Sequence, residues 1–284
     1  MLAYRHAFHA GNHADVLKHT TLVAVLRHMN LKDKAYRLVD THAGAGGYSL
    51  QSDYANKRGE YAQGVGALWS LPDLPPALAD YLSLVKRFNS GGALLQYPGS
   101  PALAQMLLRT QDQMRLFELH PTDHKILSSF LGEAVGTEIK MSDGFAGLKS
   151  TLPPTSKRAV VLIDPSYELK ADYARTLAAF REALERFAQA TVIVWLPQIQ
   201  LLEAAQLPQR LKASAEVQAK KGWLHARLTV RSTSDRGFGL HGSHIFVANP
   251  PHTLAQMLRE VLPVLQQKLA QDAGAGHVLE VSGA

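Results

Sequence analysis

The feature that most restricts the fold of this chain is the alternation of two kinds of segment. Short runs rich in apolar and β-favouring residues predict strands at 36–40, 114–118, 138–141, 159–164 and 191–196. Helix-like stretches, such as 123–135 and 172–189, separate most of these runs. Strands that alternate with helices predict an α/β fold with a mostly parallel sheet covered on both faces.

The last part of the chain breaks this alternation. Two strand-like runs, 224–231 and 244–249, are separated only by a glycine-containing loop, which is too short for a helical crossover and predicts an antiparallel pair. A helix is expected over 253–270, after Pro250 and Pro251. A parallel sheet closed by an antiparallel C-terminal hairpin is typical of Rossmann-like class I methyltransferases, whereas dinucleotide dehydrogenases lack this hairpin.

The spacing of the first two predicted strands indicates an insertion. The first strand ends at Asp40 and the next begins near residue 114, which is more chain than a single crossover needs. We therefore expect a core of residues 1–48 and 97–284, and a small inserted helical subdomain of residues 49–96. The first 30 residues are expected to cover the site.

Charge and composition favour a polyanionic partner inside the cell. The chain of 284 residues carries a formal net charge of +6 and no cysteine, which excludes a disulfide framework and a thiolate metal site. No signal-peptide-like run opens the sequence, and apolar runs such as 191–197 are far too short to span a bilayer. We expect a cytoplasmic protein without a membrane segment.

Three ligand-type loops follow the first three predicted strands. The glycine-rich loop 40–48 contains Gly44, where the backbone can turn sharply and approach a ligand. Glu118 ends the second strand and is suited to accept hydrogen bonds from ribose hydroxyls. After the third strand, Asp143 is suited to the adenine amino group and Gly144 leaves room for the ring. A turn, a solvated acid or an Asp-Gly turn would explain each loop alone, but together they predict an adenosine-containing cofactor.

The sequence Asp164-Pro165-Ser166-Tyr167 ends the fourth predicted strand. It resembles the [D/N]-P-P-[Y/F/W] motif of amino-group methyltransferases, with Ser166 in place of the second proline. An aromatic amine is a poor nucleophile, and acceptors for its hydrogens assist it as the nitrogen becomes pyramidal. The Asp164 carboxylate and the Pro165 carbonyl supply acceptors, and Tyr167 is suited to stack on a base swung out of its own stack. Asp-Pro alone would indicate only a turn.

Further motifs make the resemblance more specific. Over essentially the whole chain, the sequence is similar to the bacterial 23S ribosomal RNA adenine-N6 methyltransferases of the large-subunit J type. The matching motifs, of which the His-rich opening segment is the most specific, are Tyr4-Arg-His-Ala-Phe-His-Ala-Gly-Asn-His-Ala-Asp-Val-Leu-Lys-His19, Asp-Thr-His42-Ala-Gly-x-Gly-x-Tyr, Tyr-Pro-Gly-Ser100-Pro, Glu118-Leu-His-Pro, Asp143-Gly144, Ile-Asp-Pro-Ser-Tyr and Gly-Ser-His-x-Phe-Val-x-Asn-Pro-Pro.

The resemblance implies a fold, ligands and roles. It implies a Rossmann-like domain with a helical insertion, S-adenosyl-L-methionine as cofactor, 23S ribosomal RNA as partner, a monomer, and no metal. It implies a substrate contact at Tyr4, and cofactor contacts at His19, His42, Ser100, Glu118, Asp143, Gly144 and Asp164.

The residues themselves say less about the histidines and Ser100. His19 lies on an amphipathic segment and is expected to close over the methionine part of the cofactor, although a helix-end histidine is the ordinary interpretation without the resemblance. Without the resemblance, His42 would likewise be an ordinary loop residue and Tyr4 an ordinary aromatic residue near the chain terminus. Ser100 is expected to N-cap a helix over 101–109. His9 and His13 are one helical turn apart, but no carboxylate completes a metal triad.

Two other functions remain open from the residues alone. A related enzyme could methylate cytosine N4 or a protein glutamine with a similar motif. A non-catalytic RNA-binding or DNA-uptake accessory protein would also suit the basic charge, but it would not need Asp164-Pro-Ser-Tyr167. Several cations are candidates for phosphate binding, although solvated surface is the default for each: Arg5, Lys18, Lys57, Arg58, Lys220 and Lys221.

Overall fold

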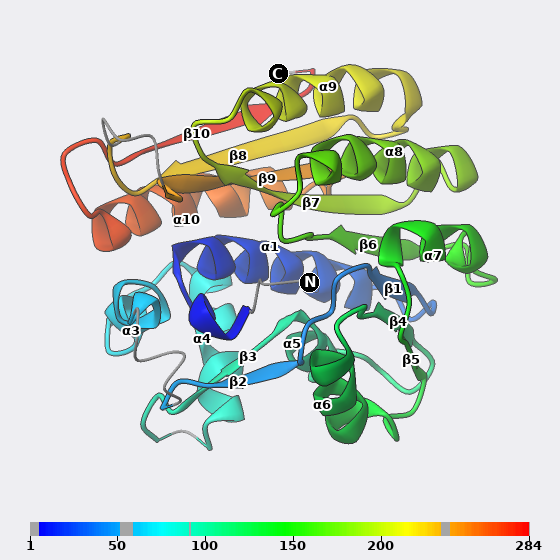
Figure 1. Cartoon of the computed structure of the whole chain (residues 1–284), viewed down its shortest axis with the longest axis horizontal. Helices are drawn as coiled ribbons and strands as arrows, with labels where there is room; N and C mark the ends of the chain where they lie inside the picture. The colour runs from blue at the N-terminus through cyan, green and yellow to red at the C-terminus, as the bar shows by residue number, and fades with distance from the viewer. Residues whose placement is uncertain (1–5, 52–58, 91, 234–238, 284) are drawn as a thin grey trace.

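The structure, a computed structural model, describes residues 6–51, 59–90, 92–233 and 239–283. One eight-stranded sheet organises it, in the order β10-β8-β9-β7-β6-β1-β4-β5 (Figure 1). Its strands are β1 (Arg37–Asp40), β4 (Gln113–Phe117), β5 (Thr137–Lys140), β6 (Ala159–Ile163), β7 (Thr191–Gln198), β8 (Trp223–Thr229), β9 (Gly242–Ala248) and β10 (Gly276–Val281).

The sheet is parallel from β5 to β7 and antiparallel beyond. β1 lies centrally and pairs in parallel with β4 and β6, and β5 and β7 extend the parallel part. β9 pairs antiparallel with both β7 and β8, and β10 pairs antiparallel with β8. The predicted Rossmann-like class with an antiparallel C-terminal hairpin is confirmed. The ends of these predicted strands differ from those observed by at most two residues.

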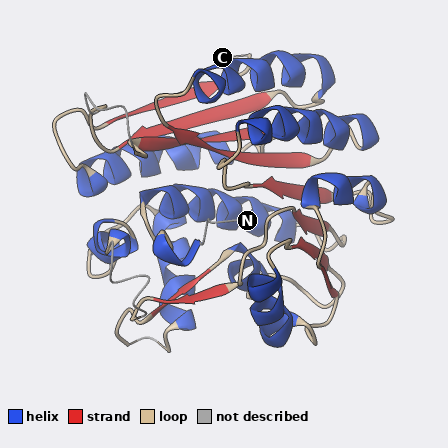
Figure 2. Cartoon of the chain, in the orientation of Figure 1, coloured by secondary structure: helices blue, strands red, loops and turns tan. Residues whose placement is uncertain are grey.

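Helices cover both faces of the sheet (Figure 2). One face carries α7 (Gly144–Thr151), α8 (Lys170–Arg186) and α9 (Leu202–Gln218), and the other carries α1 (His13–Asn30) and α10 (Leu254–Leu269). Neighbouring strand residues point to opposite faces, so Leu38 joins one core cluster and Val39 the other. The remaining helices outside the insertion are η1 (His6–Phe8), α5 (Ser100–Gln105) and α6 (Pro121–Leu131).

Helix α1 is buried on every side rather than amphipathic. Asn12 caps its start by accepting from the backbone N–H groups of Ala14 and Asp15. All residues from 13 to 26 are buried, because α1 packs against β9 and α10 as well as α4 and α5. Figure 1 shows it running through the middle of the molecule. The expectation of an amphipathic segment was wrong, because the inserted residues cover the face that would otherwise meet water.

The stretch 49–96 packs onto α1 rather than apart from it. Its described elements are η2 (Glu60–Gln63), α3 (Val65–Leu68) and α4 (Pro76–Phe88). β2 (Gly47–Ser49) and β3 (Gln96–Pro98) pair antiparallel where the chain leaves and returns. Neither short strand was predicted. The proposed domain boundaries stay a prediction, although this pair lies at both of them.

Ser100 does not cap the helix that follows it. Helix α5 begins at Ser100 itself, its N-cap residue is Gly99, and it ends at Gln105 rather than near 109. The Ser100 hydroxyl donates instead to Asp40. Within the described ranges, no helix is both long enough and apolar enough to cross a membrane.

Candidate functional site

A cavity of about 450 Å³ opens at the carboxyl ends of the parallel strands. Loops after β1, β4, β5 and β6 line it, together with the start of α1 and the start of α5. This is where ligands bind in open α/β sheets. The cavity brings together every predicted site residue that the structure describes, namely His19, His42, Gly44, Ser100, Glu118, Asp143, Gly144, Asp164, Pro165 and Tyr167. Tyr4 lies outside the described residues.

Glu118 is fixed between two loops. Its Oε2 accepts from the Gly44 N–H at 2.8 Å, and its Oε1 accepts from the His120 N–H at 2.6 Å. Gly44 has a φ of +62°, and a Cβ there would lie 2.2 Å from the Tyr48 hydroxyl, so the turn requires glycine. Burial raises the pKa of Glu118. The carboxylate is therefore rigidly placed at the cavity wall.

Asp143 and Gly144 have structural partners of their own. Asp143 caps α7 by accepting from the Phe145 N–H at 3.0 Å, and it forms an ion pair with Arg175. A Cβ on Gly144 would lie 1.9 Å from the Thr41 carbonyl oxygen. The close approach of the loop after β1 thus explains this glycine, which is a different reason from the predicted room for an adenine ring.

His42 lies in the cavity wall as a neutral side chain. Burial lowers its pKa to about 3. Its Nδ1 lies 2.8 Å from the Thr41 hydroxyl, and its ring meets Phe145 edge-on at 4.7 Å. The Arg175 guanidinium covers Phe145 at 4.5 Å from the ring centroid. His42, Phe145 and Arg175 therefore form a packed wall rather than a loose loop.

A buried carboxylate that sequence reasoning left without a role connects two parts of the site. Asp40 is fully buried and accepts from the Ser100 hydroxyl at 2.6 Å and from the His42 N–H at 3.1 Å. Burial raises the pKa of Asp40 to about 6. Asp40 was visible as the last residue of the first strand. Its partner Ser100 lies 60 residues further on, beyond the insertion.

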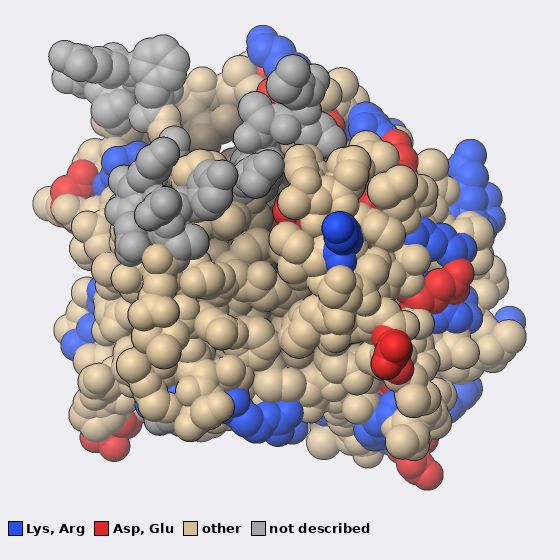
Figure 3. Space-filling view, turned by 60° about the horizontal axis from the view of Figure 1, so that its bottom comes forward, with Lys and Arg blue, Asp and Glu red and all other residues tan. Residues whose placement is uncertain are grey.

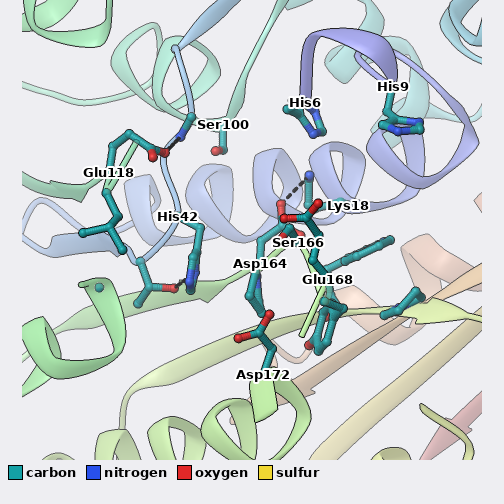
Figure 4. Close-up of a pocket in the computed structure, with 18 of the residues that line it drawn as sticks. His6, His9, Lys18, His42, Ser100, Glu118, Asp164, Ser166, Glu168 and Asp172 are labelled. Carbon is teal, nitrogen blue, oxygen red and sulfur yellow. Dashed lines mark hydrogen bonds and ion pairs between the residues drawn. The ribbon is translucent and has the colours of Figure 1, made fainter. Parts of the chain in front are cut away.

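Asp164 forms an ion pair with a buried lysine. Lys18 Nζ lies 2.5 Å from Asp164 Oδ2 and 2.8 Å from Asp15 Oδ1, and Figure 4 shows Lys18 pointing from α1 toward Asp164. The Lys18 side chain is only 5% exposed. The default of solvated surface was therefore wrong for Lys18. Its spacing of three residues from Asp15 on a helix was the one available signal.

The two carboxylates beside Lys18 differ in environment. Burial alone would raise the pKa of Asp15, but His6 and Lys18 hold it well below its usual range. His6 Nε2 lies 2.9 Å from Asp15 Oδ2, and the Gly11 N–H donates to the same oxygen. For Asp164, burial outweighs Lys18 and the pKa is raised. Asp164 is thus the acid whose charge is less firmly held.

Tyr167 is held in an uncommon backbone conformation. Its φ is +54°, in the left-handed region that side chains rarely adopt. Its hydroxyl donates to the Trp195 carbonyl at 2.8 Å, and its ring centroid lies 4.7 Å from that of Tyr173. Tyr167 is 7% exposed and lines the cavity with Pro165. The proposed stacking on a base stays a prediction.

Of the two histidines near the start of α1 that were considered as metal ligands, His9 pairs with a carboxylate and His13 is buried. His9 Nδ1 lies 2.8 Å from Glu60 Oε2, and burial lowers the pKa of His13 to about 4. No cluster of three or more potential metal ligands occurs in the part of the chain that the structure describes. The absence of a metal stays a prediction.

Known proteins resemble this chain over nearly its full length. The family model described as "Ribosomal RNA large subunit methyltransferase D, RlmJ" matches residues 33–281. Ribosomal RNA large subunit methyltransferase J of Escherichia coli (strain K12) is 43% identical, covering 98% of this chain and 97% of the relative. The protein of the same name from Haemophilus influenzae (strain ATCC 51907 / DSM 11121 / KW20 / Rd) is 41% identical, covering 99% and 98%. Protein LPL1258 from Legionella pneumophila str. Philadelphia 1 has a solved structure that superposes with a TM-score of 0.86 at 30% identity, covering 96% and 98%.

Proposed function

Because the chain belongs to the RlmJ family of ribosomal RNA large subunit methyltransferases, we propose that it methylates the N6 amino group of one adenine in 23S ribosomal RNA. Methyltransferase activity on ribosomal RNA with S-adenosyl-L-methionine follows from the family. The choice of adenine N6 and the extrusion of the target base are the finer parts of the proposal.

The cavity fits S-adenosyl-L-methionine by the chemistry of its wall. Glu118 offers carboxylate oxygens for ribose hydroxyls, and its two backbone donors already fix its orientation. We assign His19, His42, Gly44, Ser100, Asp143 and Gly144 to the same cofactor, since all of them line the cavity. When bound, the cofactor supplies the methyl group. Figure 4 shows Glu118, Ser100 and His42 on one side of Asp164, with His6 and His9 on the other.

The observation that carries the proposal is the setting of Asp164. It follows β6 directly, lines the cavity, and keeps a side chain that is 14% exposed beside Lys18. A carboxylate there is available to accept a hydrogen from an adenine amine as its nitrogen takes the methyl group. Lys18 holds Asp164 Oδ2 in place before the substrate binds, so the carboxylate is preorganised for the reaction.

The substrate is expected to reach this cavity as an extruded or unpaired base. A base within a duplex cannot present its amino group to a buried carboxylate, so loop or single-stranded adenines are favoured. Tyr167 and Pro165 are assigned to the base, and Tyr4 to the RNA. The net charge of +6 supports a polyanionic partner. Figure 3 shows one face of the molecule, and on it lysine and arginine side chains gather toward the right-hand side, with a few acidic side chains among them.

Methyl transfer to RNA free of protein tests the proposal. The chain is incubated with labelled S-adenosyl-L-methionine and protein-free 23S ribosomal RNA, and the RNA is digested to nucleosides. We expect the label in N6-methyladenosine, and none when Asp164→Ala replaces the wild type under the same brief exposure. Label found only in N4-methylcytidine, or only in added ribosomal protein, would sink the proposal.

We also propose that the protein works in the cytoplasm as a monomer without a bound metal. Light scattering of the purified chain at several concentrations measures the oligomeric state, and metal analysis of active protein measures the metal content. A stable dimer, or activity that is lost on chelation and restored by one divalent metal, would contradict these parts alone.

A further inference from the structure

A buried chain of hydrogen bonds leads from the inserted residues to the cavity. Tyr81 Oη, on α4, lies 2.9 Å from Tyr97 Oη, on β3, and Tyr97 Oη lies 2.7 Å from Nδ1 of His19, on α1. The side chains of both tyrosines are fully buried, and His19 is 1% exposed. The rings of His19 and Tyr97 also stack, with centroids 5.6 Å apart. His19 lines the cavity, so the chain ends at the site.

The hydroxyl groups of this hydrogen-bond network can donate in two directions, and only one direction gives both hydroxyl hydrogens an acceptor. If Tyr81 donates to Tyr97 and Tyr97 donates to His19 Nδ1, every hydroxyl hydrogen has an acceptor. If His19 Nδ1–H donates instead, Tyr97 donates to Tyr81, and the Tyr81 hydrogen then has no acceptor among the described residues. A buried donor without an acceptor is unfavourable. The first direction is therefore favoured, and Nδ1 is an acceptor.

The negative charge of Asp15 beside the other ring nitrogen, Nε2, favours the same tautomer. His19 Nε2 lies 4.0 Å from Asp15 Oδ1, beyond hydrogen-bond range but close enough for electrostatic attraction. Burial lowers the pKa of His19 to about 3, so the ring is neutral and carries one proton. An N–H that points toward the anionic Asp15 is more stable than a lone pair in that position.

We propose that Tyr97 is a positioning residue that fixes His19 as the Nε2–H tautomer, so that the ring donor lies on the side of Asp15, which lines the cavity together with His19. A donor suits an acceptor oxygen, and in the amino-acid part of S-adenosyl-L-methionine that group is the carboxylate rather than the ammonium. This inference rests on the proposed function only for the identity of the ligand.

The tautomer is measured directly by nitrogen NMR of protein labelled with ¹⁵N-histidine. The two ring nitrogens of a neutral histidine differ strongly in chemical shift, and a His19→Gln spectrum assigns the signals. We expect the wild type to carry its proton on Nε2. In Tyr97→Phe, the ratio of Nε2–H to Nδ1–H should fall about tenfold or more, because no hydroxyl hydrogen then needs Nδ1 as its acceptor. A wild-type proton on Nδ1 would overturn the proposal.

Tyr36→Phe is the matched control. Tyr36 is also a buried tyrosine, but its hydroxyl has no hydrogen-bond partner among the described residues, so Tyr36→Phe removes a hydroxyl without removing a hydrogen bond seen there. The His19 signals should not move in this variant. If they move as far as in Tyr97→Phe, the effect is general loosening of the core and the proposal fails.

Binding of S-adenosylhomocysteine, followed by calorimetry, tests the consequence for the ligand without any methyl transfer. Tyr97→Phe should weaken binding about tenfold, and Tyr36→Phe should leave it unchanged. His19→Gln should bind more tightly than His19→Asn, because the glutamine amide nitrogen reaches the position of Nε2. The reverse order would overturn the assignment of Nε2 as donor. Failure of RNA methylation with an intact Nε2–H tautomer would refute the proposed function and leave this inference standing.

Discussion

Lys18→Met removes the buried cation that the carboxylates of Asp15 and Asp164 share. Removing one partner of a buried ion pair typically costs about 3–5 kcal/mol, because the other charge stays buried without compensation. Asp15 keeps its contacts with His6 and the Gly11 N–H, whereas Asp164 loses the Lys18 ammonium at 2.5 Å. The Asp164 side chain is 14% exposed, so water replaces part of the interaction. We therefore expect the free energy of unfolding to fall by about 3 kcal/mol at neutral pH.

The loss should depend on pH in a defined direction. In the wild type, the two acids raise the pKa of Lys18 above 10.5, so Lys18 stays charged throughout the acidic and neutral range. Burial already raises the pKa of Asp164 above 3.8, and removal of Lys18 raises it further. A carboxyl whose pKa is raised in the folded state destabilises the fold as the pH rises through that pKa. The deficit of Lys18→Met should thus shrink as the pH falls toward 4.

Urea unfolding at pH 4.5 and pH 7.5 measures both effects. Arg27→Met is the matched control, because Arg27 pairs with Asp80 at 2.7 Å but its side chain is 48% exposed. That exposed pair should contribute less than about 1 kcal/mol. A deficit for Lys18→Met that is no larger than that of Arg27→Met, or that stays constant between the two pH values, would refute the reasoning.

Three further variants give separate tests. Asp164→Ala should lower the single-turnover rate at saturating ligands by about two orders of magnitude, and Asp164→Asn by less, because an amide oxygen still accepts; a wild-type rate would make Asp164 only a turn residue. Glu118→Ala should weaken cofactor binding by roughly 1–3 kcal/mol in calorimetry and leave RNA affinity unchanged; equal cofactor affinity would contradict its assignment. Asp40→Asn should raise the free energy of unfolding by about 1–3 kcal/mol at pH 8 and by little near pH 4. The reason is that the pKa of Asp40 is about 6 in the folded state and 3.8 in the unfolded state, so the wild type loses stability as the pH rises between these values. Urea unfolding that shows no gain at pH 8 would argue that Asp40 is not held as a destabilised anion.

The fold could be predicted wherever burial leaves a simple pattern in the sequence. β6 is buried at every position, and its apolar run predicted a strand that ends one residue beyond the observed one. β10 was missed because it is only partly buried and includes His277 and Glu280. Helix α1 was assigned an exposed face because the sequence does not reveal that residues 49–96 return to cover it.

The site was predictable as a set of loops but not as a set of contacts. Strand ends meet at one edge of a parallel sheet, so Glu118, Asp143 and Asp164 were expected to converge. The partner of a buried acid is set by packing across long sequence separations. Lys18 reaches Asp164 over 146 positions, and its residue type alone indicates solvated surface. Ser100 was assigned to a helix cap because Asp40 is distant in sequence.

The placement of α1 has a consequence for folding of the protein during its synthesis on the ribosome. This helix is synthesised before every strand of the sheet, yet part of its apolar surface is covered by β9 and α10, which are made more than 200 residues later. At typical rates of synthesis, about 5–20 residues per second, this surface waits on the order of ten seconds or more for its partners. The nascent chain thus offers a bare apolar helix to chaperones, and a truncated chain that ends before β9 should aggregate rather than settle into a smaller fold.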